Sequence, residues 1–293
     1  PPDILSPASA AAPLSAAPPP AIPRQSAAAR SSAVAAVAPA TTVVPPPGTV
    51  APHPFYGPLL FHSGRMRCLV GYEHLSAFRV RARVRASGER WFSEYLASRL
   101  LLGDLGAHDA GIHVLLACLP HRRALPVAAE RVTVWRQPAG LVRVDAEERS
   151  HDGDDYVYDV RLSDQDGVPI ARWDGLRLRA YGPRPWPEPP PAPLVGPLLS
   201  RRLAELGLAD RLELVTTEDA VVAHAATPVG VARADDGRTA VARALLDLGL
   251  PGDAGVVVED RTEDGLLVCG TAAARVVAFT GPRSVAVALP REA

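Results

Sequence analysis

Two polar residues interrupt an apolar stretch of this sequence and could do proton-transfer chemistry. Asp109 and His113 lie four residues apart within Leu102–Pro126, which reads LGDLGAHDAGIHVLLACLPHRRALP. Residues four apart share one face of a helix. A carboxylate and an imidazole are costly to bury on such a face unless they are paired or take part in a reaction. Together they could hold a proton and transfer it to a ligand.

The residues after this pair have the spacing of a helix. Ile112, Leu115, Leu116 and Leu119 recur with a helical period, so the pattern predicts a helix over about 107–120. Two other interpretations of the pair stay open. Asp109 would suit the first turn of the helix, where the dipole favours a carboxylate, with His113 as a satisfied core histidine.

A metal site is the other alternative, with His108, Asp109 and His113 as ligands. It is disfavoured because His108 and His113 are five residues apart, a poor spacing for one helix face, and no fourth ligand is evident.

The flanking sequence predicts a sheet that would position this helix. Residues 76–86 alternate apolar side chains with arginines, the period-two pattern of a half-buried strand. Further strands are predicted at 66–72, 125–136, 141–149, 155–163 and 168–181. Residues 89–101 predict a short helix or an irregular turn. One buried helix followed by four antiparallel strands predicts an α+β fold in which the sheet wraps around the helix.

Proline-rich stretches divide the chain of 293 residues, which is long enough for about two domains. Residues 1–54 predict a disordered Pro/Ala-rich linker, with a helix over 27–38 as the alternative. The sheet–helix domain would span 55–183, and a second linker 184–197. Residues 198–293 predict a smaller α+β region. Its helices are expected at 198–208 and 238–250, and its strands at 211–217, 255–260, 265–271, 274–280 and 284–290.

Composition excludes some classes of function. The formal net charge is −1, which gives no electrostatic case for nucleic acid or an anionic membrane as partner. Three widely spaced cysteines fit a reducing compartment. Neither an apolar run of about 20 residues nor a signal peptide is present, so we expect a cytoplasmic protein. Because position 1 is Pro and the only methionine is Met66, we expect a piece of a longer chain.

Several consecutive blocks resemble the dehydratase domain of polyketide synthases. The blocks are YGPLLFHSGR, the D-x-x-x-H helix followed by LP, ERSHDGDDYVYDVRL, RWDGLRLRAYGP and PLVGPLLSRRL, and they cover about 55–205. They resemble the C-terminal half of the family's double-hotdog fold, most closely in iterative enediyne-type synthases. The resemblance implies dehydration of β-hydroxyacyl thioesters by a hydro-lyase of polyketide biosynthesis.

The resemblance also implies roles for individual residues. Asp109 matches the family's catalytic acid, and His113 matches the residue that holds the hydroxyl or the carboxyl. Tyr56, Phe61, Leu125 and Pro126 match positions that line the acyl tunnel. The substrate would be carried on the phosphopantetheine of an acyl carrier protein, with no directly bound cofactor and no metal. Expected partners are that carrier protein, other domains of the same synthase and a second copy in a homodimer.

The sequence departs from the family at one important point. The first hotdog of the family carries its catalytic base in H-x-x-x-G-x-x-x-x-P, and this pattern is absent here. His62 lies in the Tyr-Gly-Pro segment, where the family does not place its base. We therefore expect half an active site and no dehydration by this chain alone. A non-catalytic docking or scaffold remnant that binds carrier protein is the alternative, and a stand-alone thioesterase-like hotdog is a third.

Residues 198–293 resemble a truncated, degenerate phosphopantetheinyl transferase. The family's Ser-His and acidic magnesium-binding motifs are missing, and the chain has no lysine for W-x-x-K-E. We expect neither a metal site nor transferase activity there. The arginines of 79–85 could meet an acidic carrier protein or a phosphate, although a solvated strand face is favoured.

Overall fold

The computed structural model describes residues 53–88, 103–186, 190–252, 255–262, 266–281 and 283–291. The predicted linker up to residue 52, the alternative helix 27–38 and the predicted helix or turn 89–101 lie outside these residues. We call residues 53–186 the hotdog region and residues 190–291 the C-terminal region. In the described part of the chain, no helix is long and apolar enough to cross a membrane.

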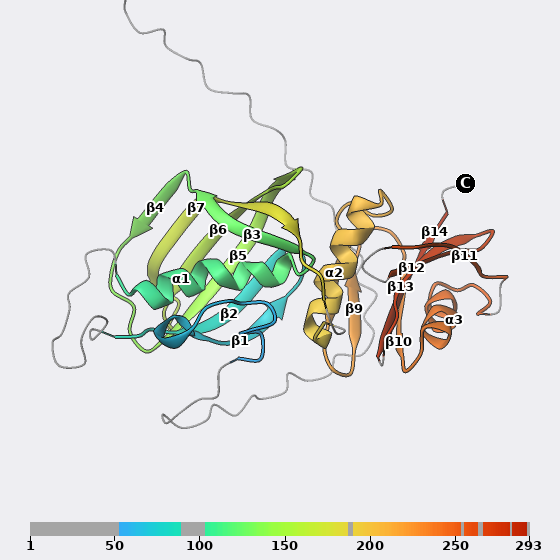
Figure 1. The fold of residues 1–293 in the computed structure, drawn as a ribbon, viewed down its shortest axis with the longest axis horizontal. Coiled ribbons are helices and arrows are strands. Elements are labelled where there is room, and N and C mark those ends of the chain that lie inside the picture. Colours follow the sequence, from blue (N-terminus) through green and yellow to red (C-terminus); the bar gives the residue numbers. More distant parts are fainter. Residues whose placement is uncertain are drawn as a thin grey trace, which may run out of the picture. The chain divides into compact units, whose positions relative to one another are not determined.

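Seven antiparallel strands form one curved sheet in the hotdog region (Figure 1). They are β1 (Leu69–Leu75), β2 (Arg79–Arg85), β3 (Arg122–Ala128), β4 (Arg131–Val134), β5 (Leu141–Asp152), β6 (Asp155–Ser163) and β7 (Pro169–Pro183). Their spatial order is β1-β2-β5-β6-β7-β3, and β4 also pairs with β7. In β2 the apolar residues are buried and alternate with arginines, which confirms the period-two prediction.

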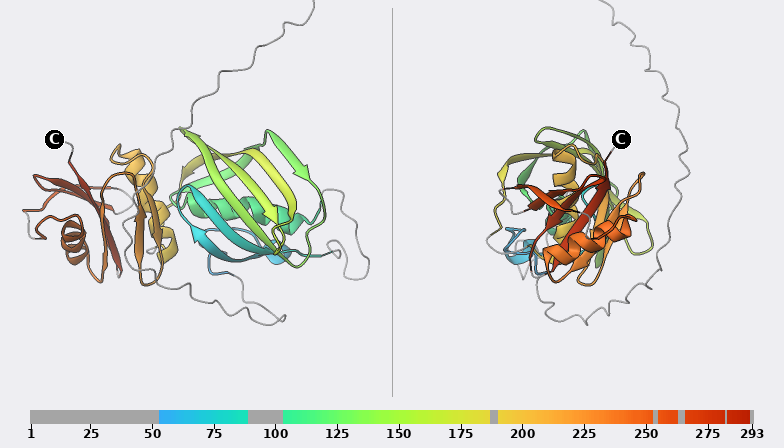
Figure 2. Two further views of the ribbon diagram at one scale, coloured as in Figure 1. Left: turned by 180° about the vertical axis from the view of Figure 1, so that it is seen from behind. Right: turned by 90° about the vertical axis from the view of Figure 1, so that its right-hand side faces the viewer.

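Helix α1 (Leu105–His113) lies across the inner face of this sheet (Figures 1 and 2). It begins at Asp104, whose side chain accepts a hydrogen bond from the amide of Ala107 at 2.8 Å. It continues as a 3₁₀ helix, η2 (Val114–Cys118), so the predicted helix 107–120 is α-helical only as far as His113. The α+β fold with a sheet wrapped around a helix is confirmed.

Small residues let α1 approach the sheet closely. Ala107, Ala110 and Gly111 lie on its buried face. A Cβ atom at Gly111 would come within 2.9 Å of Leu162 Cδ1 on β6, closer than carbon atoms pack. Gly111 therefore lets the helix lie close to Leu162 of β6, and the apolar side chains of η2 complete the core.

The C-terminal region contains both helices and strands, and its place as a separate domain stays a prediction. It contains α2 (Ala192–Glu205), β8 (Glu213–Thr216), β9 (Val221–His224), β10 (Gly230–Ala234), α3 (Gly237–Asp247), β11 (Val257–Arg261), β12 (Leu266–Gly270), β13 (Ala274–Phe279) and β14 (Ser284–Pro290). Five of these strands form an antiparallel sheet in the order β10-β14-β13-β12-β11, against which α3 packs (Figure 1). Strands β9 and β10 were not predicted.

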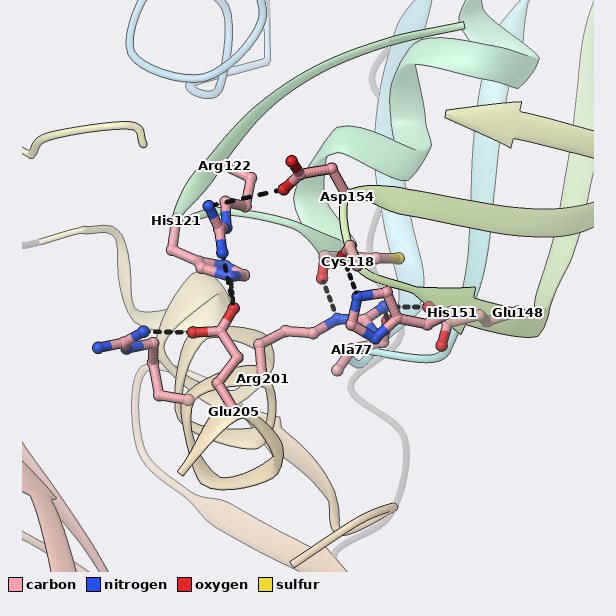
Figure 3. Close-up of polar contacts among 11 residues, drawn as sticks. Ala77, Cys118, His121, Arg122, Glu148, His151, Asp154, Arg201 and Glu205 are labelled. Atoms are coloured by element: carbon pink, nitrogen blue, oxygen red, sulfur yellow. Dashed lines mark hydrogen bonds and ion pairs between the residues drawn. The ribbon is translucent and has the colours of Figure 1, made fainter. Parts of the chain in front are cut away.

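Helix α2 changes the boundary between the two regions. It begins at Ala192, so the predicted linker 184–197 overlaps its first turns. Its Arg201 is buried and reaches into the hotdog region, where it donates to the carbonyl of Cys118 at 3.2 Å and pairs with Glu148 (Figure 3). Glu205 of the same helix contacts His121 at 2.8 Å. α2 is therefore joined to both regions by polar contacts and packing.

Candidate active site

The predicted pair of Asp109 and His113 forms a hydrogen bond on α1. The Oδ2 atom of Asp109 lies 3.0 Å from Nδ1 of His113, one helical turn later. The His113 side chain is 2% exposed and that of Asp109 is 32% exposed. The imidazole is therefore enclosed by the protein, while the carboxyl reaches an accessible surface where it could meet a ligand.

A third titratable residue, His62, joins this pair. Its Nε2 atom lies 3.2 Å from the same Oδ2 atom of Asp109. The imidazole is held between two rings: Phe61 stacks on it with centroids 4.3 Å apart, and the ring of His113 lies 4.0 Å away. His62 was not among the predicted site residues.

Tyr56 supports the cluster from the loop before β1. Its hydroxyl lies 3.2 Å from Nε2 of His113 and accepts a hydrogen bond from the amide of Leu69 at 2.9 Å. Tyr56 was predicted as a contact for the acyl chain. The structure places its ring against His113 and its hydroxyl in a hydrogen-bonded chain that runs from Leu69 through His113 to Asp109.

Burial controls the protonation of the supporting groups. It raises the pKa of Tyr56 to about 12, so the hydroxyl keeps its proton at neutral pH. Burial, together with the nearby His113, lowers the pKa of His62 despite the opposing effect of Asp109. His62 is therefore a neutral imidazole at pH 7.

The cluster also has a donor set that a metal ion could use. Ligand atoms of His62, Asp109 and His113 all lie within 4.8 Å of one another. This set replaces the one considered from sequence, because His108 turns away and its ring packs edge-on against Trp173 at 5.3 Å. A hydrogen bond joins Asp109 and His113, and Nε2 of His62 lies 3.2 Å from the same carboxylate oxygen, so the arrangement is equally suited to moving a proton. The expectation of no metal stays a prediction.

The remaining predicted contacts lie in two places. Phe61 is 69% exposed and stacks on His62, beside the cluster. Leu125 and Pro126 lie on β3, at the edge of the sheet, and are exposed. Their predicted role in an acyl tunnel stays a prediction.

The arginine strand faces a polar hollow of about 660 Å³ over β2, β5 and β6, away from the Asp109 cluster. Arg79 pairs with Glu147 at 3.2 Å, and Arg81 pairs with Asp145 at 2.6 Å. Because carboxylates on β5 already neutralise these arginines, the arrangement favours a solvated strand face over an anion-binding surface.

Comparison with known proteins finds one family model that matches the part of the chain that contains Asp109 and His113. Residues 71–186 match the family model described as the polyketide synthase dehydratase N-terminal domain. This part of the chain is similar to a polyketide synthase dehydratase domain. The description names the N-terminal domain, whereas the sequence blocks were interpreted as the C-terminal hotdog. The match therefore supports the similarity to a dehydratase domain, but it does not support the assignment to the C-terminal hotdog. No curated protein matches the chain.

Solved structures show distant similarity. GphF dehydratase 1 is 20% identical with a TM-score of 0.34, and the match covers 41% of this chain and 46% of that one. The dehydratase domain of RzxB from Pseudomonas fluorescens is 17% identical with a TM-score of 0.34, covering 40% and 42%. A hypothetical thioesterase with coenzyme A from Streptococcus pneumoniae is 10% identical with a TM-score of 0.31, covering 39% and 86%. The chain spans less than half the length of these two dehydratase structures.

Sequence reasoning missed His62 because nothing local connects it to Asp109, 47 positions later. The available signal was a histidine beside Phe61 in an aromatic loop, close to Tyr56. Only the packing of that loop on α1 brings His62 to the carboxyl.

Proposed function

We propose that this chain is part of a polyketide synthase dehydratase that converts β-hydroxyacyl thioesters on an acyl carrier protein into enoyl thioesters. Loss of water requires a base for the α-proton and an acid for the departing hydroxyl. Asp109 is the acid and His113 orients it. The observation that carries this proposal is the contact of 3.0 Å between the partly exposed carboxyl and the buried imidazole, within a segment that matches the dehydratase family model.

The base would come from a second hotdog. The family's H-x-x-x-G-x-x-x-x-P motif does not occur in this sequence, so this chain alone is expected to be inactive. Exposed apolar side chains at the β3–β4 edge support a covering partner of this kind. They include Val127, Val132 and Trp135, each more than half exposed. Assignment of this chain to the C-terminal, acid-bearing half rests on the Asp109 helix.

The substrate would reach the site on the phosphopantetheine arm of the carrier protein, without another bound cofactor. Tyr56 and Phe61 would border the acyl chain near Asp109, and Leu125 and Pro126 would extend that border along β3. Other synthase domains and a second copy of the parent chain are the expected partners, in the cytoplasm. The finer family is an iterative enediyne-type synthase, supported by the order of the sequence blocks.

For the C-terminal region we propose a degenerate, truncated transferase-like unit without activity. Its support is the absence from the sequence of the acidic and lysine-containing motifs. Measurable transfer of phosphopantetheine from coenzyme A to a carrier protein would refute this assignment.

The deciding experiment is the substitution Asp109→Ala in the full-length parent synthase. Loss of the acid should reduce dehydration by about 10²- to 10⁴-fold, while loading of the carrier protein stays intact. Asp166→Ala, in the exposed turn before β7, is the matched control and should dehydrate at the wild-type rate. Wild-type dehydration by the Asp109 variant would overturn the catalytic assignment and favour the scaffold remnant that binds carrier protein.

A further inference from the structure

The hydrogen bonds around His113 determine where its proton lies. Tyr56 accepts from the amide of Leu69, so the hydroxyl proton is free to point toward Nε2 of His113 at 3.2 Å. Nε2 is then the acceptor, and a neutral imidazole carries its proton on the other nitrogen. His113 therefore donates Nδ1–H to Oδ2 of Asp109 at 3.0 Å.

The surroundings of His62 determine its tautomer in a similar way. Its Nδ1 atom is buried and makes no hydrogen bond within the described residues. A buried acceptor without a partner is better tolerated than a buried N–H without one. The single proton of the neutral ring therefore belongs on Nε2, which lies 3.2 Å from Oδ2 of Asp109.

We propose that His62 and His113 both donate N–H to Oδ2 of Asp109, which leaves Oδ1 as the oxygen that exchanges a proton with the ligand. His62 is thus a positioning residue of the site, acting through Asp109. This arrangement is argued from the Asp109–His113 hydrogen bond and the approach of His62 Nε2 to within 3.2 Å of Oδ2, whereas the identity of the ligand, the β-hydroxyl of an acyl thioester, rests on the proposed function.

Two donors on one oxygen have a defined role in the dehydration step. The Cβ–O bond breaks and the departing hydroxyl takes the proton from Oδ1, leaving as water. The α-proton goes to the base of the second hotdog, and the electrons of that C–H bond form the C=C bond. Asp109 becomes a carboxylate, and the two N–H groups already in place stabilise the charge as it develops.

The tautomers can be measured directly by long-range ¹H–¹⁵N correlation spectra of the histidine rings in this chain at neutral pH. We expect opposite tautomers, with the proton of His62 on Nε2 and that of His113 on Nδ1. A proton on Nδ1 of His62, or a doubly protonated ring, would overturn the proposal. This readout does not depend on dehydration, so it separates failure of this arrangement from failure of the proposed function.

The kinetic test uses His62 variants of the full-length parent. His62→Ala removes one donor to Asp109 and should lower kcat by about 10- to 100-fold. This loss is at or below the usual cost of removing one preorganised hydrogen-bond donor. KM should stay within about twofold. His62→Gln offers an amide N–H in place of the imidazole and should recover at least several-fold of that loss. His224→Ala, at an exposed position of β9 in the C-terminal region, is the control and should match the wild type.

Two kinetic outcomes would overturn the role of His62. One is a wild-type kcat for His62→Ala. The other is a folded His62→Gln variant no faster than His62→Ala, since filling space without restoring the rate would show that the ring only packs.

Discussion

The two regions of the molecule bury polar groups of different kinds. In the C-terminal region, apart from Arg201, the buried polar residues among those described are small hydroxyls: Ser200, Thr216, Thr271 and Ser284. Each makes a hydrogen bond with a main-chain group. In the hotdog region, buried Ser76 and Asp104 likewise bond to main-chain amides. Buried His113, His121 and Glu148, in contrast, bond to other side chains.

This difference distinguishes buried polar side chains that only support the structure from buried polar side chains that could take part in a reaction. A hydroxyl that satisfies the backbone is neutral at every relevant pH and needs one fixed partner. A buried imidazole or carboxyl can change its charge, so it requires titratable or charged partners nearby. Among the described residues, the hotdog region has three such groups, one of which is the pair of His121 and Glu205. A second, centred on Asp109, reaches an accessible surface. Another, formed by Arg201 and Glu148, is enclosed and joins the regions.

The largest effect on stability is expected from Arg201→Met, which tests the enclosed pair. It leaves the Glu148 carboxylate buried without its cation and should cost about 3–5 kcal/mol of unfolding free energy. The matched control is Arg283→Met, because Arg283 forms an exposed pair with Glu218. That change should cost less than about 1 kcal/mol. Urea unfolding measures both, and equal costs would remove the distinction between enclosed and exposed pairs.

A pair of single-hydroxyl deletions compares the two regions directly. Tyr56→Phe leaves Nε2 of His113 and the Leu69 amide without a partner, and Thr216→Val does the same to the Gly196 amide. Each should destabilise its region by about 1–3 kcal/mol in urea unfolding. In the parent synthase only Tyr56→Phe should slow dehydration. An equal loss of activity in the Thr216 variant would contradict the distinction between structural polar groups and polar groups suited to chemistry.

Acid should weaken the hotdog region first. Burial lowers the pKa of His53 to about 4 and also lowers the pKa values of His62, His108 and His121. Below pH 6.5 the unfolded chain then binds more protons than the folded one, so this stability is complete above about pH 6.5 and falls as the pH approaches 4.

Tryptophan fluorescence can measure this acid effect selectively, because all four tryptophans lie between residues 91 and 186. The midpoint of urea unfolding reported by fluorescence should decrease between pH 7.5 and pH 5. The only histidine of the C-terminal region is His224, so hydrogen exchange of β12–β14, corrected for the intrinsic rate, should change less. A midpoint that is independent of pH would contradict this difference.

The smallest effect is expected on the outer face of β2. Arg81→Ala removes an exposed pair with Asp145 and should change the unfolding free energy by less than about 1 kcal/mol. Its affinity for an acyl carrier protein, measured by titration, should equal that of the wild type. A large loss of affinity would show that this face binds the carrier protein and would revise the interpretation of the arginines.

Elements with strong local patterns could be predicted from the sequence. The alternation in 76–86 identified β2, and the spacing of four identified the contact between Asp109 and His113. Strands β9 and β10 were missed because they are short and their sequences, VVAH and GVARA, show no regular alternation of apolar and polar residues, although their burial alternates. The start of α2 was missed because its prolines indicated a boundary, although proline is tolerated in the first helical turn.

The other features that could not be predicted from the sequence depend on tertiary contacts. Arg201 and Arg202 are adjacent on an amphipathic helix, and only the packing of α2 shows that Arg201 is the enclosed one. His62 belongs to the site because the loop before β1 folds over α1. Neither contact has a sequence spacing that could reveal it.

The contact of α2 with both regions has a consequence for module engineering. A recombinant fusion cut in the proline-rich stretch near 187–191 would remove Arg201 and leave Glu148 without its counterion. The hotdog region of each such fusion would then lose stability as the Arg201→Met variant does. A junction placed after Glu205, in the exposed turn that follows α2, keeps the ion pair and the His121 contact on the same polypeptide and is the better point for exchange.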